Sequence, residues 1–120
     1  MSKKAVLVTG GFDPIHKGHI EYLREAKKLG DILYVGLNSD HWLTRKKGKP
    51  FMDLENRAMV IQSLDMVDEV IIFNDEDNSS CHAIEQTLLF YDEVIFANGG
   101  DRLLSNIPEY EKYKLSLIHI

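Results

Sequence analysis

Four short apolar segments recur along the chain, at residues 5–8, 32–37, 69–73 and 93–97. The stretches between them place apolar residues every three or four positions, as Ile20, Leu23 and Ala26 do. Continuous apolar runs of this length predict strands that are buried on both faces. The three-to-four spacing predicts helices with one apolar side.

Polar residues and glycines mark where these helices begin and end. The first helix is expected after Gly18 and before Gly30. Three further helices have candidate N-caps, namely Asn38 or Ser39 for a short helix through Leu43, Asp53 for a third, and Ser79 or Ser80 for a fourth that ends near Tyr91. Residues 45–50 are predicted to be a basic loop, because Gly48 and Pro50 interrupt them.

The alternation of strand and helix predicts an α/β fold. Parallel strands joined by right-handed crossovers give a single-domain, open, doubly wound sheet with helices on both faces. In such sheets, ligands bind at the carboxyl ends of the strands, near the point where the strand order reverses. Functional residues are therefore expected in the loops that follow the strands.

Composition narrows the class of protein. The chain has 120 residues, of which 44% are hydrophobic and 28% charged, which is typical of one soluble domain. Its net charge of -5 argues against a general nucleic-acid binder. No apolar run approaches the roughly 20 residues needed to span a bilayer, so no membrane partner is expected. The lone Cys81 is interpreted as a packed helix residue and favours a cytoplasmic location.

The loop after the first strand carries the main chemical signal. It contains His16 and His19, three residues apart, at the entry to a helix. A helix N-terminus offers backbone N–H groups and partial positive charge to a phosphate, and imidazoles can donate further hydrogen bonds. A single histidine at such a place is more often a cap or a surface residue, but the pair after a first strand favours phosphate binding.

Two common phosphate-binding loops do not fit this segment. The Walker pattern requires Gly-Lys-Ser/Thr, whereas residues 17–19 are Lys-Gly-His. The dinucleotide pattern requires three glycines at fixed spacing, and neither Gly10 nor Gly11 is followed by the other two. An NAD-dependent enzyme is therefore not indicated.

Gly11-Phe12-Asp13 followed by His16-x-Gly18-His19 resembles the signature of cytidylyltransferase-like nucleotidyltransferases. The resemblance extends from about Lys4 to Arg102 and implies a Rossmann-like sheet. It also implies an enzyme that transfers a nucleoside monophosphate to a phosphorylated small molecule and releases pyrophosphate.

The resemblance implies roles for particular residues. His16, His19, Lys46, Lys49 and Arg57 match the positions that contact the phosphates and stabilise the transferring group. Nucleotide contacts are implied for the loop residues Gly11, Phe12, Asp13 and Gly18 and for the turn Gly99, Gly100 and Asp101. Asp40 belongs to a turn that the resemblance places near the acceptor or the metal, and Asp13 is a candidate ligand for Mg²⁺ unless it caps a backbone turn. Apart from the resemblance, Trp42 is a candidate for the acceptor pocket.

The mechanism expected from this resemblance needs charge stabilisation more than a strong base, because the acceptor phosphate is already ionised. Lysines, arginine, histidines and Mg²⁺ would stabilise the leaving pyrophosphate. One branch of the family uses CTP with glycerol 3-phosphate, and another uses ATP with a heptose 1-phosphate. Residues 38–40, 73–77 and 98–101 resemble the second branch more closely and so favour ATP and a sugar phosphate. A homodimer is the expected assembly.

Two other interpretations stay open at this stage. The family usually carries a Ser/Thr-rich segment at a last helix, which the sequence lacks, and residues 115–120 resemble a translated sequencing adapter. We therefore expect the domain in residues 1–114 and interpret residues 115–120 as a non-native end. The alternatives to an active enzyme are a truncated, catalytically inactive nucleotide-binding domain and a regulatory binding module.

Overall fold

The structure is a computed structural model that describes residues 3–91, 93–98 and 116–119. Its strands are β1 (Lys4–Gly10), β2 (Ile32–Leu37), β3 (Glu69–Ile72), β4 (Glu93–Asn98) and β5 (Ser116–His119). Its helices are α1 (Lys17–Lys27), α2 (Asp40–Lys47), α3 (Leu54–Gln62) and α4 (Cys81–Leu88).

The five strands form one parallel sheet in the order β3-β2-β1-β4-β5. The chain builds outward from β1 to β3 and then crosses to the other side of β1 for β4, so the order reverses beside β1. The predicted doubly wound α/β fold is confirmed. Strand β5 was not predicted, and it falls within the segment interpreted as a non-native end, an interpretation that this pairing does not test.

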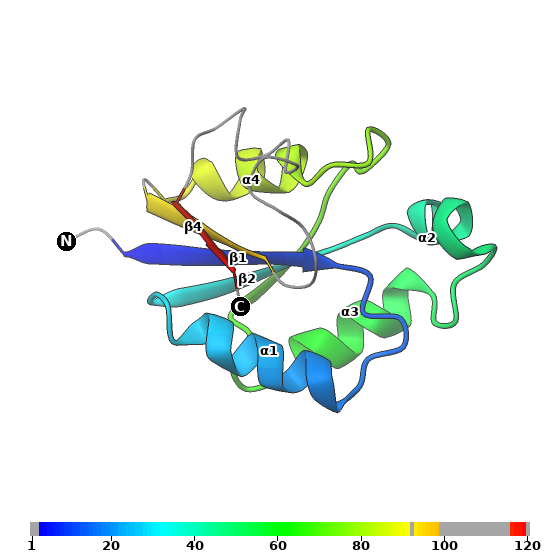
Figure 1. Ribbon diagram of the computed structural model, residues 1–120, viewed down its shortest axis with the longest axis horizontal. Helices are drawn as coiled ribbons and strands as arrows, with labels where there is room; N and C mark the ends of the chain where they lie inside the picture. Colours follow the sequence, from blue (N-terminus) through cyan, green and yellow to red (C-terminus); the bar gives the residue numbers. More distant parts are fainter. Residues whose placement is uncertain (1–2, 92, 99–115, 120) are drawn as a thin grey trace.

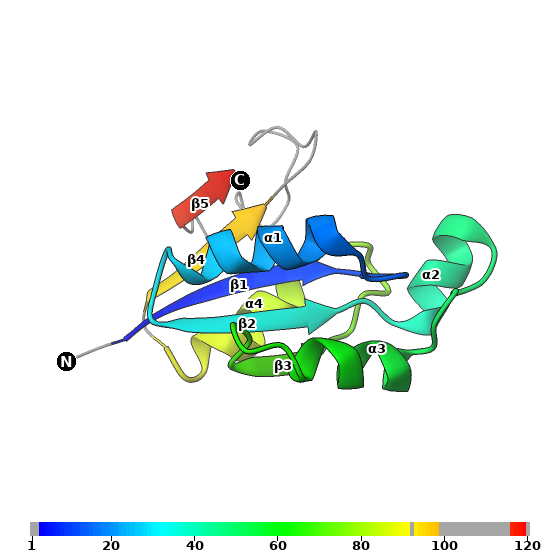
Figure 2. The same cartoon turned by 90° about the horizontal axis from the view of Figure 1, so that it is seen from below.

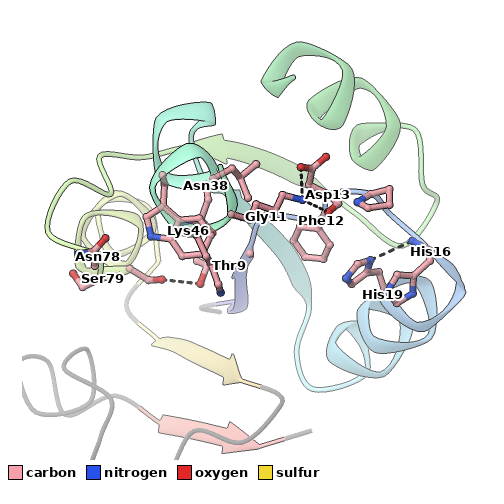
Figure 3. Close-up of a pocket in the computed structure, with 16 residues that line it drawn as sticks. Thr9, Gly11, Phe12, Asp13, His16, His19, Asn38, Lys46, Asn78 and Ser79 are labelled. Carbon is pink, nitrogen blue, oxygen red and sulfur yellow. Dashed lines mark hydrogen bonds and ion pairs between the residues drawn. The ribbon is translucent and has the colours of Figure 1, made fainter. Parts of the chain in front are cut away.

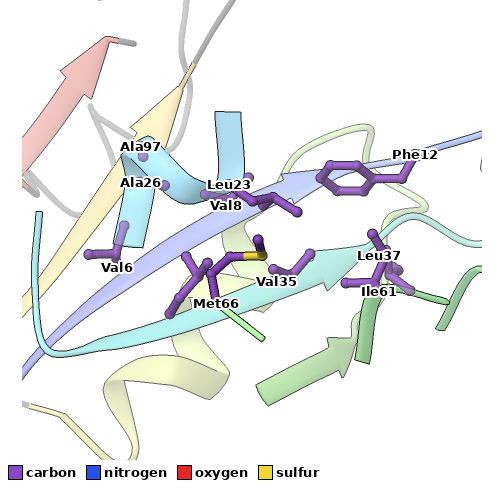
Figure 4. Close-up of a cluster of buried hydrophobic side chains, with 11 residues drawn as sticks. Val6, Val8, Phe12, Leu23, Ala26, Val35, Leu37, Ile61, Met66 and Ala97 are labelled. Atoms are coloured by element: carbon purple, nitrogen blue, oxygen red, sulfur yellow. The ribbon is translucent and has the colours of Figure 1, made fainter. Parts of the chain in front are cut away.

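Each face of the sheet is covered by helices, with α1 and α3 on one side and α4 on the other (Figures 1 and 2). Alternate side chains of β1 point to opposite faces: Val6 and Val8 pack toward α1, and Ala5 and Leu7 pack toward α4. All four are fully buried. The larger core, shown in Figure 4, lies on the α1 and α3 side of the sheet. There Leu23 of α1 packs against strand residues such as Val8.

Helix α2 is longer than the sequence pattern suggested. Residues 45–47 form its last turn, so the prediction of a basic loop beginning at Arg45 was wrong there. Arginine and lysine are good helix formers, and nothing stops the helix before Gly48. Gly48 has a φ of 97°, a left-handed conformation that favours glycine and ends the helix.

The predicted caps of α2 and α3 are confirmed. The Ser39 hydroxyl accepts a hydrogen bond from the Trp42 N–H at 3.0 Å, and the Asp53 carboxylate accepts one from the Asn56 N–H at 2.9 Å. Cys81 begins α4 and is buried, as expected. Within the described ranges, none of the helices combines the length and the apolar character needed to cross a bilayer.

Truncation of the core should be costly. Leu23→Ala removes a fully buried side chain, and we expect the free energy of unfolding to fall by about 2–5 kcal/mol. Met59→Ala on α3 is the matched control, because Met59 is 66% exposed and its loss should cost under about 1 kcal/mol. Urea unfolding measures both. Equal losses would contradict the assignment of Leu23 to the core.

Candidate functional site

A pocket of about 690 Å³ opens at the carboxyl ends of β1 and β2. It lies where the strand order reverses, as the sequence analysis predicted. Residues of five segments line it: the end of β1 with its following loop, the first turn of α1, the turn after β2, helix α2, and the loop before α4. Figure 3 shows His16 and His19 at one end of the pocket and Asn78 and Ser79 at the other.

The two histidines stack at the start of α1. Their ring centroids are 3.9 Å apart with an interplanar angle of 26°. The His16 Nδ1 accepts a hydrogen bond from the Gly18 N–H at 3.1 Å, and the His19 Nδ1 accepts one from the His16 N–H at 3.2 Å. A neutral imidazole that accepts at Nδ1 carries its proton on Nε2. Each ring therefore retains an Nε2–H donor at the pocket.

The surroundings of His19 favour its neutral form. Burial, and then the charge of the adjacent His16, lower the pKa of His19 below its usual value of 6.5. The ring also packs edge-to-face against Phe12, with centroids 5.1 Å apart. Phe12 is itself nearly buried and has a positive φ of 50°, so the loop holds it in a conformation that few bulky residues adopt. The His19 ring is therefore a neutral hydrogen-bond donor that Phe12 and the His16 N–H hold in place.

Gly18 has a steric role that the sequence did not reveal. It does not line the pocket, and a Cβ atom there would lie 2.9 Å from the His16 Cε1. The absence of a side chain thus makes room for the His16 ring. Its predicted contact with nucleotide stays a prediction.

Asp13 connects the loop after β1 to the backbone of residues 51–52. Its side chain is 1% exposed, and its carboxylate accepts hydrogen bonds from the backbone N–H groups of Phe51 and Met52. The Lys47 ammonium lies 2.7 Å from the same carboxylate. Although burial raises the pKa of Asp13, the contacts with Lys47, Phe51 and Met52 hold it below its usual value.

These contacts do not fit the predicted metal role of Asp13. Both carboxylate oxygens already accept hydrogen bonds from backbone N–H groups, and one of them also pairs with the Lys47 ammonium, so the protein itself occupies the positions that a metal ion would need. Across the residues that the structure describes, there is no group of three or more His, Cys, Asp or Glu side chains that could hold a metal ion. Residues 3–91, 93–98 and 116–119 therefore offer no protein cage for Mg²⁺, and the Asp13 carboxylate instead orders the backbone at residues 51–52.

Arg57 is buried among backbone carbonyls and does not line the pocket. Its side chain is 0% exposed. It donates to the carbonyl oxygens of Met52 (3.0 Å), Gly11 (3.0 Å) and Asn38 (2.7 Å). It also pairs with the Asp40 carboxylate at 2.7 Å. The guanidinium thus fastens the loops after β1 and β2 to each other, and its predicted phosphate contact stays a prediction.

Helix α2 brings two of the predicted residues to the pocket. Trp42 and Lys46 both line it, with the Lys46 ammonium 4.7 Å from the centre of the Trp42 ring. Lys49 follows the helix, is exposed and lies outside the lining. Asp40 also lies outside the lining and pairs with Arg57. The structure therefore gathers Lys46 and Trp42 with the histidines, but not Lys49 or Asp40.

Sequence reasoning missed several lining residues. Besides Gly10, Pro14, Asn38 and Leu43, the structure adds Thr9, Lys47, Asn78, Ser79 and Ser80 to the predicted set. The signal that could have found the last three is their place after a neighbouring parallel strand, whose carboxyl end meets the same edge of the sheet. The predicted nucleotide contacts Gly99, Gly100 and Asp101 lie outside the described residues.

Asp75 is buried although it belongs to the acidic run of residues 75–77. This residue is 3% exposed, and its carboxylate accepts hydrogen bonds from Asn38 and Ser39. The side-chain donors that Asp75 needs come from a turn more than 30 residues away, so the sequence carries no local sign of its burial. Its neighbours Glu76 and Asp77 are exposed.

Comparisons with known proteins agree with this geometry. The family model described as cytidylyltransferase-like matches residues 7–115. The bifunctional protein HldE of Helicobacter pylori (strain HPAG1) is 47% identical over 76 residues, and that of Geobacter metallireducens is 48% identical over 77. Each match covers 62% of this chain and 16% of the relative, so the chain matches only a small part of these larger proteins.

A solved structure extends the similarity to the whole fold. The crystal structure of the lipopolysaccharide core biosynthesis protein from Thermoplasma volcanium aligns with a TM-score of 0.77 and 28% identity. The alignment covers 98% of this chain and 96% of that one. The resemblance drawn from the sequence is therefore confirmed for family and for fold.

The low pKa of His19 can be tested by NMR titration. We expect the His19 ring to titrate below 6.5, and His16→Ala to move its pKa back toward 6.5, because the neighbouring charge and some burial are lost. Since the folded pKa lies below the unfolded one, the stability tied to neutral His19 is present above pH 6.5. It is lost as the pH falls through the folded pKa. Titration of His19 at or above 6.5 would contradict this account.

Arg57 should be needed for folding even without a ligand. Arg57→Met leaves three backbone carbonyls without their donor, and we expect the free energy of unfolding to fall by about 3 kcal/mol. Arg24→Met on the exposed side of α1 is the matched control and should change it by under about 1 kcal/mol. If urea unfolding gave both variants the stability of the parent, Arg57 would serve only a ligand.

Proposed function

Because this chain belongs to the cytidylyltransferase-like family, we propose that it transfers a nucleoside monophosphate from a nucleoside triphosphate to a phosphorylated sugar or polyol and releases pyrophosphate. Membership in the family indicates a nucleotidyltransferase, whereas the nucleotide and the acceptor named here are proposed for this chain. ATP is the proposed nucleotide and a sugar phosphate the proposed acceptor, with CTP as the other candidate.

The observation that carries the proposal is the stacked histidine pair. Both Nδ1 atoms accept backbone hydrogen bonds, so each ring has an Nε2–H donor remaining at the N-terminal end of α1. Fixed donors beside the positive end of a helix dipole suit a triphosphate. Donors that are already in place when charge develops need no reorganisation, which is the main source of catalysis in phosphoryl transfer.

In the proposed reaction, an oxygen of the acceptor phosphate attacks the α-phosphorus of the nucleotide. A new P–O bond forms, and the bond between the α-phosphorus and its bridging oxygen breaks as pyrophosphate leaves. His16 and His19 donate to phosphate oxygens throughout. Lys46 supplies positive charge from the wall of the pocket, and its contact with the Trp42 ring keeps it there.

Lys49 and Mg²⁺ would contribute only when the nucleotide is bound. Lys49 lies outside the lining, so it would contribute only if residues 48–53 closed over the nucleotide. Mg²⁺ would arrive on the triphosphate oxygens, since the described residues offer no protein cage for it. Its contribution would be neutralisation of phosphate charge.

The end of the pocket opposite the histidines suits the acceptor. It presents the polar side chains of Asn78 and Ser79 (Figure 3). The Trp42 ring of α2 also lines the pocket and shares a smaller hollow with Asn78. An aromatic face beside amide and hydroxyl groups matches a sugar, which has apolar C–H surfaces and several hydroxyl groups. The two substrates would then meet between Lys46 and His19.

Pyrophosphate release tests the proposal. The full chain is incubated with Mg²⁺, ATP or CTP, and a panel of sugar and polyol phosphates. We expect release that depends on the acceptor, with ATP and a sugar phosphate. Release without acceptor dependence would contradict the proposed transfer. Nucleotide binding with no release across the panel would favour a binding domain without catalysis.

The histidine pair should be essential for that release. His19→Ala removes one positioned donor, and we expect kcat to fall about 100-fold or more while the fold is retained. His82→Ala is the matched control, because the His82 side chain is 44% exposed, lies 3.5 Å from the Glu85 carboxylate and does not line the pocket. If both variants turned over at the parental rate, the assignment of His19 would be overturned.

A further inference from the structure

The acceptor end of the pocket is built from two segments that are far apart in sequence. One is helix α2, with Trp42 and Lys46, and the other is the loop of residues 74–80, with Asn78 and Ser79. We propose that Asp75 and Arg45 are positioning residues that fix the spacing between these two segments and so determine how tightly the phosphorylated acceptor binds. This inference rests on the proposed function.

Asp75 fastens the loop to the start of α2. One carboxylate oxygen accepts hydrogen bonds from the Asn38 side chain at 3.1 Å and from the Ser39 N–H at 2.8 Å. The other accepts the Ser39 hydroxyl at 2.8 Å. A residue that is 3% exposed and has three donors directed at its carboxylate is held in one place, because any displacement would leave buried donors unpaired.

Arg45 joins the same two segments one turn further along α2. Its guanidinium donates to the Asp75 carbonyl oxygen at 3.0 Å and to the Asn78 side-chain oxygen at 3.2 Å. Asn78 has a φ of 61°, a left-handed conformation that asparagine tolerates better than most residues. Its backbone N–H also donates to the Asp75 carbonyl at 3.0 Å. Arg45 therefore orients a side chain that lines the pocket.

The network continues into the aromatic wall. The Ser39 hydroxyl that donates to Asp75 also accepts the Trp42 N–H, as the N-cap of α2. Movement of Asp75 would thus displace the first turn of α2, including Trp42. No hydrogen bond found among the described residues links Asp75 or Arg45 to His16 or His19, which belong to the loop after β1. Loss of either positioning residue should therefore affect the acceptor more than the nucleotide.

The experiment compares Arg45→Met and Asp75→Ala with Glu76→Gln. Glu76 is the exposed neighbour of Asp75, so its substitution removes one charge from the same loop without touching the network. Because Arg45 is exposed, Arg45→Met should remain folded, and it tests the inference even if the Asp75→Ala variant unfolds. We expect the KM for the sugar phosphate to rise about tenfold or more in Arg45→Met and Asp75→Ala. The KM for the nucleotide should change less than about twofold.

Trp42 gives a second measurement that needs no turnover. It is the single tryptophan of the chain, so its fluorescence reports this wall alone. We expect acrylamide to quench Trp42 more strongly in Arg45→Met and Asp75→Ala than in the parent, with Glu76→Gln unchanged. This measurement distinguishes the two proposals. If the parent protein releases no pyrophosphate, the proposed function is wrong, but the quenching still shows whether Asp75 and Arg45 position the Trp42 wall.

Three results would overturn the positioning role. The first is an unchanged acceptor KM in a folded Arg45→Met variant. The second is an equal rise in the KM values of nucleotide and acceptor, which would mean a general structural role. The third is acrylamide quenching that does not differ between Arg45→Met and the parent.

Discussion

The buried guanidinium of Arg57 is the contact on which the site depends. Three loops meet it: the loop after β1 through Gly11, the turn after β2 through Asn38, and the segment before α3 through Met52. A planar group with five donors in a fixed arrangement can satisfy several carbonyls at once, and lysine could not replace it. The buried charge is balanced by Asp40 at the start of α2. Removal of this group would release the loop after β1, the turn after β2 and the start of α2 together.

The two ends of the pocket that Arg57 supports differ in chemistry. The β1–α1 loop provides paired imidazoles whose tautomers are set by backbone donors, which suits phosphate groups. Helix α2 and the loop of residues 74–80 provide an aromatic ring, an amide and hydroxyl groups. Asp13 and Asp75 serve these ends in the same way, because each buried carboxylate ties a loop to a distant backbone segment. Asp13, a candidate metal ligand in the sequence, thus has its carboxylate engaged in holding two backbone segments together.

The sequence predicted the fold well because its signals were local and strong. Buried strands such as residues 32–37 read as continuous apolar runs, and the caps Ser39 and Asp53 act on residues three positions away. Long-range partners could not be predicted in this way. The burial of Asp75 depends on a turn at residues 38–39, and the position of Arg57 depends on carbonyls from three other segments. The end of α2 was misjudged because basic residues suit loops and helices alike, and only the conformation of Gly48 decides where the helix stops.

The central claim is that the pocket joins two phosphates, one from each substrate, and identification of the product tests this most directly. ³¹P NMR would follow the full chain with ATP, Mg²⁺ and a sugar phosphate. The account predicts two new coupled resonances of a pyrophosphate diester, in which the nucleotide α-phosphorus is bonded through oxygen to the acceptor phosphorus. They should grow in step with free pyrophosphate. Formation of ADP or of free AMP, with the acceptor phosphate unchanged, would contradict the account.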